Sequence, residues 1–183
     1  MPTTSRGLPY PSPTLPPNVP VDIQALAEAL DAWLPKQAAV TATQTLTANS
    51  TTMQNVTALV LPLGVGTWIV DVYTAYGSPA AADIKIGSTF SGTTTIATKL
   101  CVGPGTGTAD VAANTTMRAS AHGSSSAVSY GHDGSAFAGV AHETHRLVVT
   151  AAGTLQIQAA QNVANAGATS INVGTLMTGL RVA

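Results

Sequence analysis

Most of the chain alternates between apolar and polar residues with a period of two, which is the spacing of half-buried β-strands. The run at 67–76, T-W-I-V-D-V-Y-T-A-Y, places Trp68, Val70 and Val72 on one face. Comparable runs are alternating or rich in β-branched residues and are bounded by Gly, Pro, Asn or Asp. They cover residues 40–46, 56–61, 83–90, 94–102, 143–150, 154–161 and 170–182.

About eight short strands separated by turns predict an all-β fold, either an antiparallel sandwich or a barrel. Two stretches, 103–116 and 118–139, break the pattern because they are rich in Gly, Ser, Ala and Thr. Long loops are uncommon in compact domains and tend to be functional or mobile. We therefore expect exposed tips there, unless Val128, Tyr130 and Phe137 add a strand.

An apolar spacing of three and four residues predicts one short amphipathic helix over 22–35. Asp22 is its expected N-cap, and Pro35 ends it. A helix this short is marginal alone, so its apolar stripe must pack on something. Packing on its own domain and self-association at a symmetry axis fit the pattern equally well. The stripe consists of Ile23, Leu26, Ala27, Leu30, Trp33 and Leu34.

Prolines crowd the first 21 residues. Because proline fixes φ, lacks an amide donor and keeps the preceding residue out of the helical region, we expect an extended arm of polyproline II character over 1–21. Such a segment is either a loose tail, as unanchored termini often are, or a strap that docks with little loss of entropy. Apolar residues spaced along it favour the strap. The candidate attachment residues are Leu8, Pro9, Tyr10, Pro11, Leu15 and Val19.

Charge is scarce, since 8% of the 183 residues are charged where about 25% is usual. A separate monomer needs surface charge, so we expect much of the outer face to meet other protein. Seven basic and eight acidic residues leave no excess of positive charge to neutralise phosphates, which argues against nucleic acid as a partner.

No apolar run reaches the ~18–20 residues of a membrane span, and the N-terminus lacks the apolar core of a signal peptide. We expect neither membrane insertion nor secretion.

The candidate chemical groups are few, and none predicts an active site. His142 and His145 are three residues apart in a strand-like run, so they point to opposite faces and do not suit a zinc site. His122 and His132 are expected to be solvated loop residues. No Gly-x-Ser-x-Gly elbow, lysine-bearing phosphate loop or dinucleotide fingerprint occurs. We therefore expect no enzyme, no catalytic residue, no cofactor and no metal.

The remaining polar candidates lie in strand-like runs. Cys101 is single, which excludes an intramolecular disulfide, and it is expected to behave as a small apolar strand residue. Asp71, Asp83 and Lys85 stand out because the chain has so few charges. They either pair across strands or subunits, which would fix register, or lie on the solvent face.

Two stretches resemble a known family. Residues 7–31, G-L-P-Y-P-S-P-T-L-P-P-N-V-P-V-D-I-Q-A-L-A-E-A-L-D, are similar to the N-terminal attachment segment of small virion proteins of tailed bacteriophages, of minor capsid or minor tail type. The ending, G-T-L-Q-I-Q-A-A-Q-N at 153–162 and V-G-T-L-M-T-G-L-R-V-A at 173–183, resembles the trimeric tumour-necrosis-factor/C1q-like jelly-roll heads of such proteins. The earlier T-W-I-V-D-V-Y-T-A-Y followed by A-D-I-K-I is similar in order and spacing. The region 103–139 lies outside the resemblance.

The resemblance implies a homotrimer of antiparallel jelly-roll sandwiches. It divides the chain into an arm (1–21), a helix (22–35), a linker with the first strand (36–47) and a head (48–183). The helix stripe then packs within the trimer, and the apolar strand positions fill the core of the head or lie between subunits. These strand positions are Trp68, Val70, Val72, Ile84, Ile86, Leu155, Ile157, Leu176 and Leu180.

On this resemblance we expect a structural virion protein, made in the host cytoplasm and located on the capsid surface as a decoration protein or short head fibre. Its partners are then its own copies and the major capsid protein or other virion proteins, which the arm binds with the avidity of linked sites. The alternative is a minor tail protein or tail-fibre-type adhesin that contacts a host cell-surface glycan. The short linker and few aromatics (4%) favour decoration, since only Tyr130 and Phe137 lie in the candidate loop.

Overall fold

The computed structural model describes residues 19–31, 34–106, 117–134 and 138–183. The chain divides into two compact units, residues 1–35 and 36–183, and we call the second the head. Several residues singled out above lie outside the described ones: Leu8, Pro9, Tyr10, Pro11, Leu15, Trp33 and Phe137.

Among its described residues, the first unit contains one helix, α1 (Val19–Asp31), which starts earlier than expected. Asp22 therefore lies in the first turn and is not the N-cap, and Val19 belongs to the helix rather than the arm. Pro20 does not prevent this early start, because amides of the first turn have no partner within a helix. The Leu34 amide also donates to the Leu30 carbonyl at 3.0 Å, which is the residue spacing of an α-helical hydrogen bond.

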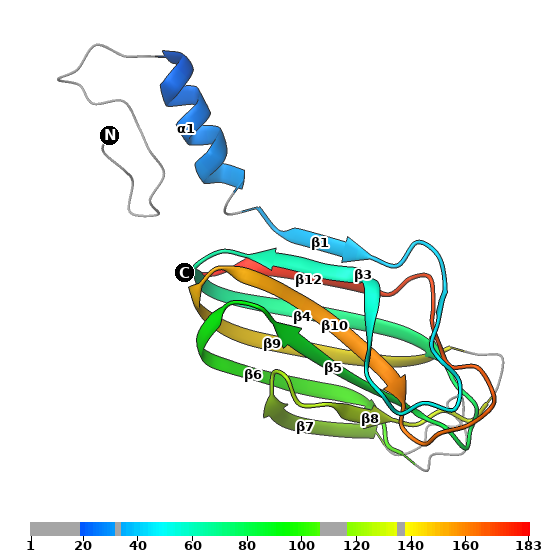
Figure 1. Cartoon of the computed structure of the whole chain (residues 1–183). Coiled ribbons are helices and arrows are strands. Elements are labelled where there is room, and N and C mark those ends of the chain that lie inside the picture. Colours follow the sequence, from blue (N-terminus) through cyan, green and yellow to red (C-terminus); the bar gives the residue numbers. More distant parts are fainter. Residues whose placement is uncertain (1–18, 32–33, 107–116, 135–137) are drawn as a thin grey trace. The chain divides into compact units, whose positions relative to one another are not determined.

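The head is an antiparallel two-sheet structure, as predicted, with one sheet layered on the other (Figure 1). The larger sheet has the order β1-β12-β4-β9-β6-β7, with β2 and β11 attached, and the smaller has the order β3-β10-β5-β8. The strands are β1 (Lys36–Ala39), β2 (Gln44–Thr45), β3 (Gln54–Leu63), β4 (Gly66–Gly77), β5 (Ile84–Phe90), β6 (Thr93–Pro104), β7 (Met117–Gly123), β8 (Val128–Tyr130), β9 (Gly139–Ala151), β10 (Gly153–Gln161), β11 (Ser170–Ile171) and β12 (Leu176–Arg181).

Three expected strand boundaries are different in the structure. In place of one strand over 40–46 there are β1 and β2, and residues 36–47 belong to the head because β1 pairs with β12. The run 170–182 is split into β11 and β12 by a turn in which Gly174 has a φ of 95°, a conformation that favours glycine. The expected tip 118–139 contains β7 and β8, since main-chain pairing forms strands there although Ser and Ala hide the pattern.

The core lies between the sheets, and it contains most of the predicted apolar positions. Trp68, Val70, Val72, Ile84, Ile86, Leu155 and Ile157 are all buried in it. Leu176 and Leu180 are not, because alternation along β12 points Met177 inward and these two leucines outward. They remain candidates for contacts between subunits only.

Candidate functional site

The outer face of the large sheet carries an apolar cluster on β4 and β12. Leu176 is opposite Tyr73 across the two strands, and Leu180 is opposite Ile69. Tyr73 and Leu180 are each 45% exposed, so no part of the chain that the structure describes covers them. We call these four residues the β4–β12 cluster.

A second apolar cluster lies on the same face, on β6 and β7. Leu100 is opposite Ala121, and Val102 is opposite Ala119. Leu100 is 52% exposed and Met117, at the start of β7, is 62% exposed. We call these five residues the β6–β7 cluster. Two such exposed apolar clusters are typical of a surface that binds another protein.

A polar strip separates the two clusters, because β9 lies between β4 and β6. Thr144 donates a 2.6 Å hydrogen bond to Asp71 Oδ1, and His142 Nε2 lies 3.3 Å from the same oxygen. Arg146 is exposed on the same strip. Asp71 therefore has cross-strand partners and is about half exposed, so both expectations for this residue hold in part.

The inner face of β9 carries a buried polar cluster that the sequence did not predict. Glu143 and His145 are fully buried there, while His142 is exposed, so the predicted opposite orientation of the two histidines is confirmed. Lys99 Nζ donates to Glu143 Oε2 at 2.8 Å, and Tyr130 Oη donates to Glu143 Oε1 at 2.8 Å. The Cys101 thiol is 3.7 Å from Oε1.

His145 extends this cluster toward the β7–β8 loop. Its Nδ1 is hydrogen bonded to Ser124 Oγ at 2.9 Å. Its Nε2 lies 3.4 Å from Glu143 Oε2, an ion-pair distance without hydrogen-bond geometry, and has no other hydrogen-bond partner among the described residues. The Ser124 hydroxyl, the His145 imidazole and the Glu143 carboxylate are therefore consecutive neighbours in space inside the head.

Burial and charge act in opposite directions on the acidic groups of the cluster. Desolvation raises the pKa of Glu143, but the contacts with His145 and Lys99 outweigh it and leave that pKa below its usual value. Burial, followed by the charge of Glu143, raises the pKa of Tyr130 and that of the Cys101 thiol. Glu143 is thus held as a carboxylate and its two neighbours as neutral donors.

A cavity of about 190 Å³ opens next to this cluster. Ser124 and Ser125 lie in its wall, together with residues of β5, β6 and β9. Ala97 and Leu147, which are opposite each other on β6 and β9, lie one inward-facing step from Lys99 and His145. The remaining lining residues are Ser88, Phe90, Gly92 and Thr94.

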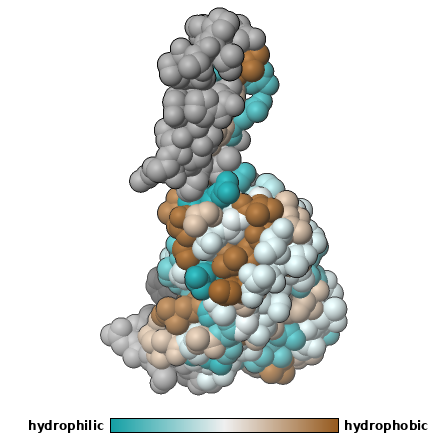
Figure 2. Space-filling view, turned by 90° about the vertical axis from the view of Figure 1, so that its left-hand side faces the viewer, coloured by the Kyte–Doolittle hydropathy of each residue, from teal (hydrophilic) through white to brown (hydrophobic). Residues whose placement is uncertain are grey.

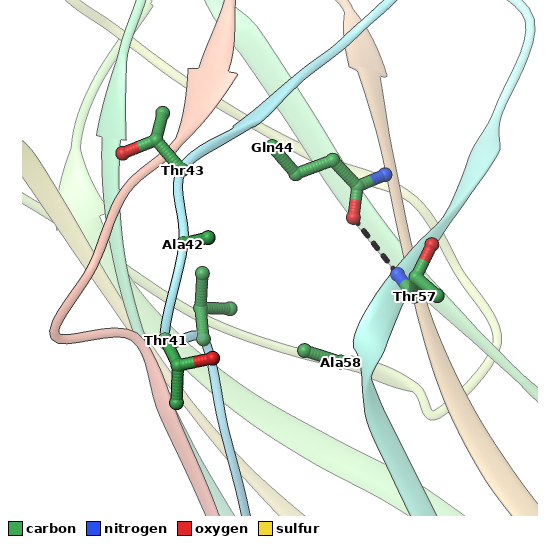
Figure 3. A pocket seen from close by; sticks show the side chains of 7 residues that line it. Thr41, Ala42, Thr43, Gln44, Thr57 and Ala58 are labelled. Atoms are coloured by element: carbon green, nitrogen blue, oxygen red, sulfur yellow. Dashed lines mark hydrogen bonds between the residues drawn. The ribbon is translucent and has the colours of Figure 1, made fainter.

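A more open groove of about 440 Å³ lies at the edge of the sandwich (Figure 3). The Gln44 side chain crosses the groove and pairs with the main chain of β3 as a neighbouring strand would. Its Oε1 accepts from the Thr57 amide and its Nε2 donates to the Asn55 carbonyl, each at 2.8 Å. The groove has no charged side chain in its walls. Its lining residues are Val40, Thr41, Ala42, Thr43, Gln44, Thr57 and Ala58.

Two sequence expectations for individual histidines were wrong. His132 is buried rather than solvated, because its amide donates to Asp83 Oδ1 at 3.1 Å and its ring packs against Tyr76. His122 lies on β7 and is bonded to Ser120, so it is not in a loop. For Tyr130 the sequence left open an exposed tip or an added strand, and the strand is confirmed, since Tyr130 is fully buried on β8.

The two other charged candidates, Asp83 and Lys85, differ in burial. Asp83 is buried and accepts a hydrogen bond from the His132 main-chain amide, whereas Lys85 is half-buried on β5.

On α1, the side chains of Ile23, Leu26 and Leu30 are exposed, so the stripe has no partner among the described residues. Both expectations for what the stripe packs on therefore stay predictions.

No group of three or more His, Cys, Asp or Glu side chains is placed to hold a metal ion among the described residues. In the same part of the chain, no helix is long and apolar enough to cross a membrane. Neither the protein-family models nor the curated proteins compared with this chain include a match.

Proposed function

We propose that the chain is a structural virion protein of a tailed bacteriophage, a homotrimeric jelly-roll head fastened to the capsid surface by its N-terminal arm and helix. The observation that carries the proposal is the outer face of the large sheet, with two separate apolar clusters on a chain that has few charges. The alternative, a tail adhesin, differs in location but uses the same trimer.

The strand pairing supports a jelly-roll head. When β2, β6, β7 and β11 are set aside, eight strands remain in the chain order β1, β3, β4, β5, β8, β9, β10, β12. The first pairs with the eighth, the second with the seventh, the third with the sixth and the fourth with the fifth. Such pairing is that of one long hairpin folded over itself into two four-stranded sheets, which is how a jelly roll is built.

The arrangement of the apolar clusters supports a ring of copies. In a cyclic assembly other than a dimer, each subunit contributes two different surfaces, one to each neighbour. The β4–β12 cluster and the β6–β7 cluster are two such surfaces, and the polar strip with Asp71 and Arg146 keeps them apart. The number three comes from the resemblance to trimeric virion heads.

The position at which the chain enters the head supports attachment at one end. Lys36 pairs with Gly179, and the C-terminal Ala183 lies beside Thr67, so the first strand begins and the chain ends at the same end of the sandwich. Figure 2 views this end, where apolar side chains gather. Val65 and Val182 are 54% and 47% exposed. An arm that anchors the protein would bring this end toward the particle.

Two measurements test the proposal. Light scattering of the whole chain at micromolar concentration should give three times the chain mass of 18.3 kDa, and a monomer would overturn it. Deletion of residues 1–34 should leave the trimer intact but abolish its binding to particles, and binding without this segment would refute the anchor. Imaging of labelled particles then distinguishes shell from tail.

A further inference from the structure

The buried polar cluster on the inner face of β9 has no role in the assembly proposed above. A shell protein requires apolar interfaces and a stable core, yet this head buries a lysine, a glutamate and a histidine in that core. Buried ionisable groups beside a cavity are typical of sites that bind or transform a ligand. Here the cavity wall includes Ser124, whose hydroxyl is bonded to one of those groups.

We propose that Ser124 is the nucleophile of a small acyl-ester site, with His145 as its general base and Glu143 as the positioning residue behind the imidazole. The geometry has the three links that such a site needs: a serine–imidazole hydrogen bond of 2.9 Å, an imidazole–carboxylate distance of 3.4 Å and an adjoining cavity. With the proton on Nε2, facing Glu143, the Nδ1 atom of His145 is free to accept the serine proton.

The residues around this relay hold its members in their roles. Lys99 and Tyr130 both donate to Glu143, which fixes the carboxylate that His145 faces. The Ser124 amide donates to the Ala97 carbonyl and its carbonyl accepts from Ser88, so the main chain at the serine is held on both sides. Ser125 lines the same cavity; in many serine hydrolases, the amide that follows the nucleophile donates to the oxyanion.

The reaction follows the usual two steps of a serine hydrolase, with water as co-reactant. Ser124 Oγ attacks the ester carbonyl carbon while His145 Nδ1 takes the hydroxyl proton, and that proton then passes to the departing alkoxide, which leaves as an alcohol. Water gives a proton to His145 and attacks the acyl-serine. The carboxylic acid leaves, and Ser124 regains its proton from His145.

The cavity restricts the substrate to a small neutral ester. A volume of about 190 Å³ admits an acetyl group and a small alcohol part, but not a long acyl chain. The lining includes the hydroxyl-bearing residues Ser88, Thr94 and Ser125 together with Phe90, and it contains no charged side chain. An acetyl ester of a hydroxylated compound is the chemical class that fits.

The test uses the whole chain with p-nitrophenyl acetate and with diisopropyl fluorophosphate. We expect a burst of nitrophenolate equivalent to one per chain, and one diisopropylphosphoryl group on the peptide that contains Ser124. S124A should abolish both, and H145Q should slow labelling by about 10²–10⁴-fold, the usual contribution of a general base. S126A is the matched control, since Ser126 is exposed in the same loop and does not line the cavity.

Three further variants separate catalysis from a purely structural role. E143Q should slow the labelling of Ser124 under conditions where circular dichroism shows the protein fully folded, and E143D, which keeps the carboxylate behind the imidazole, should restore part of the rate. S124C keeps a side chain of similar size, and iodoacetamide should alkylate it faster than the buried Cys101. Failure to label Ser124 in the folded wild type, equal rates for S124A and wild type, or no alkylation of S124C overturns the proposal.

Discussion

Lys99 on β6 and Glu143 on β9 form an ion pair of 2.8 Å in which both side chains are fully inaccessible to solvent. The two residues are diagonal neighbours, because Lys99 is directly opposite His145 and Glu143 is directly opposite Cys101. Desolvation of two charges is costly, and only good geometry with further hydrogen bonds offsets it. Tyr130 provides such a bond to the second carboxylate oxygen.

Replacing only one of the two residues of this ion pair should strongly destabilise the head. K99M leaves the Glu143 carboxylate buried without its cation, so we expect the free energy of unfolding to fall by about 3–5 kcal/mol. Replacing both residues, as in K99M/E143L, should recover much of that loss. Urea denaturation at fixed protein concentration, followed by tryptophan fluorescence, measures this. As a control, D71N on the half-exposed strip should cost at most about 1 kcal/mol.

The low pKa of Glu143 predicts a loss of stability in acid. A carboxyl whose pKa is lower in the folded than in the unfolded protein stabilises the fold above its unfolded value of about 4.3. That contribution is lost as the pH falls through the folded pKa, because the folded state then binds the proton too. The stability difference between wild type and E143Q should be constant from pH 7 to about pH 5 and shrink below about pH 4. A constant difference down to pH 3 would contradict this.

Tyr76 and Tyr130 should resist ionisation in the folded protein. Burial raises the pKa of both, with the charge of Asp83 adding to the effect at Tyr76 and that of Glu143 at Tyr130. The unfolded chain ionises first, so stability should decrease as the pH rises above about 10. Absorbance at alkaline pH should show two tyrosines fewer titrating in native than in denatured protein. The variants Y76F and Y130F should each lower by one the number of tyrosines that ionise only after unfolding.

Close packing at Gly139 predicts a position-specific effect of one methyl group. A Cβ at this residue would lie 2.5 Å from the Cζ atom of the fully buried Tyr76, whose hydroxyl is anchored to the Gly131 carbonyl. We expect G139A to destabilise the head by about 1–3 kcal/mol through overpacking. G64A is the control, since nothing lies within 4 Å of a Cβ there. Equal thermal stability of the two variants would contradict the packing argument.

Charges placed on the outer face should dissociate the proposed trimer without unfolding its subunits. L180K on the β4–β12 cluster and L100K on the β6–β7 cluster each place an unpaired charge in an apolar contact, which is costly. Each should shift the mass toward 18.3 kDa while secondary structure stays unchanged. V173K is the control, because Val173 is more exposed than either leucine but lies in the β11–β12 turn. If all three variants behave alike, the clusters are not the interface.

The sequence by itself determined the all-β class and most of the core. Alternation is a local property, and it identified the inward face at Trp68, Val70 and Val72 because each strand buries one side only. It also held a signal for the buried cluster: Glu143 and His145 share the parity of Leu147 and Val149, which places charged groups on the core face.

Only the tertiary structure decided which residues meet. Ser124, Lys99 and Glu143 come from a loop and two strands that are distant in the sequence, and their contacts depend on strand order and register. Tertiary packing also buried Tyr130, through the pairing of β8 with β5, and His132, through the hydrogen bond of its amide to Asp83 and the contact of its ring with Tyr76. Alternation fixes which face a side chain is on, but not which strand lies beside it or what covers its outer face.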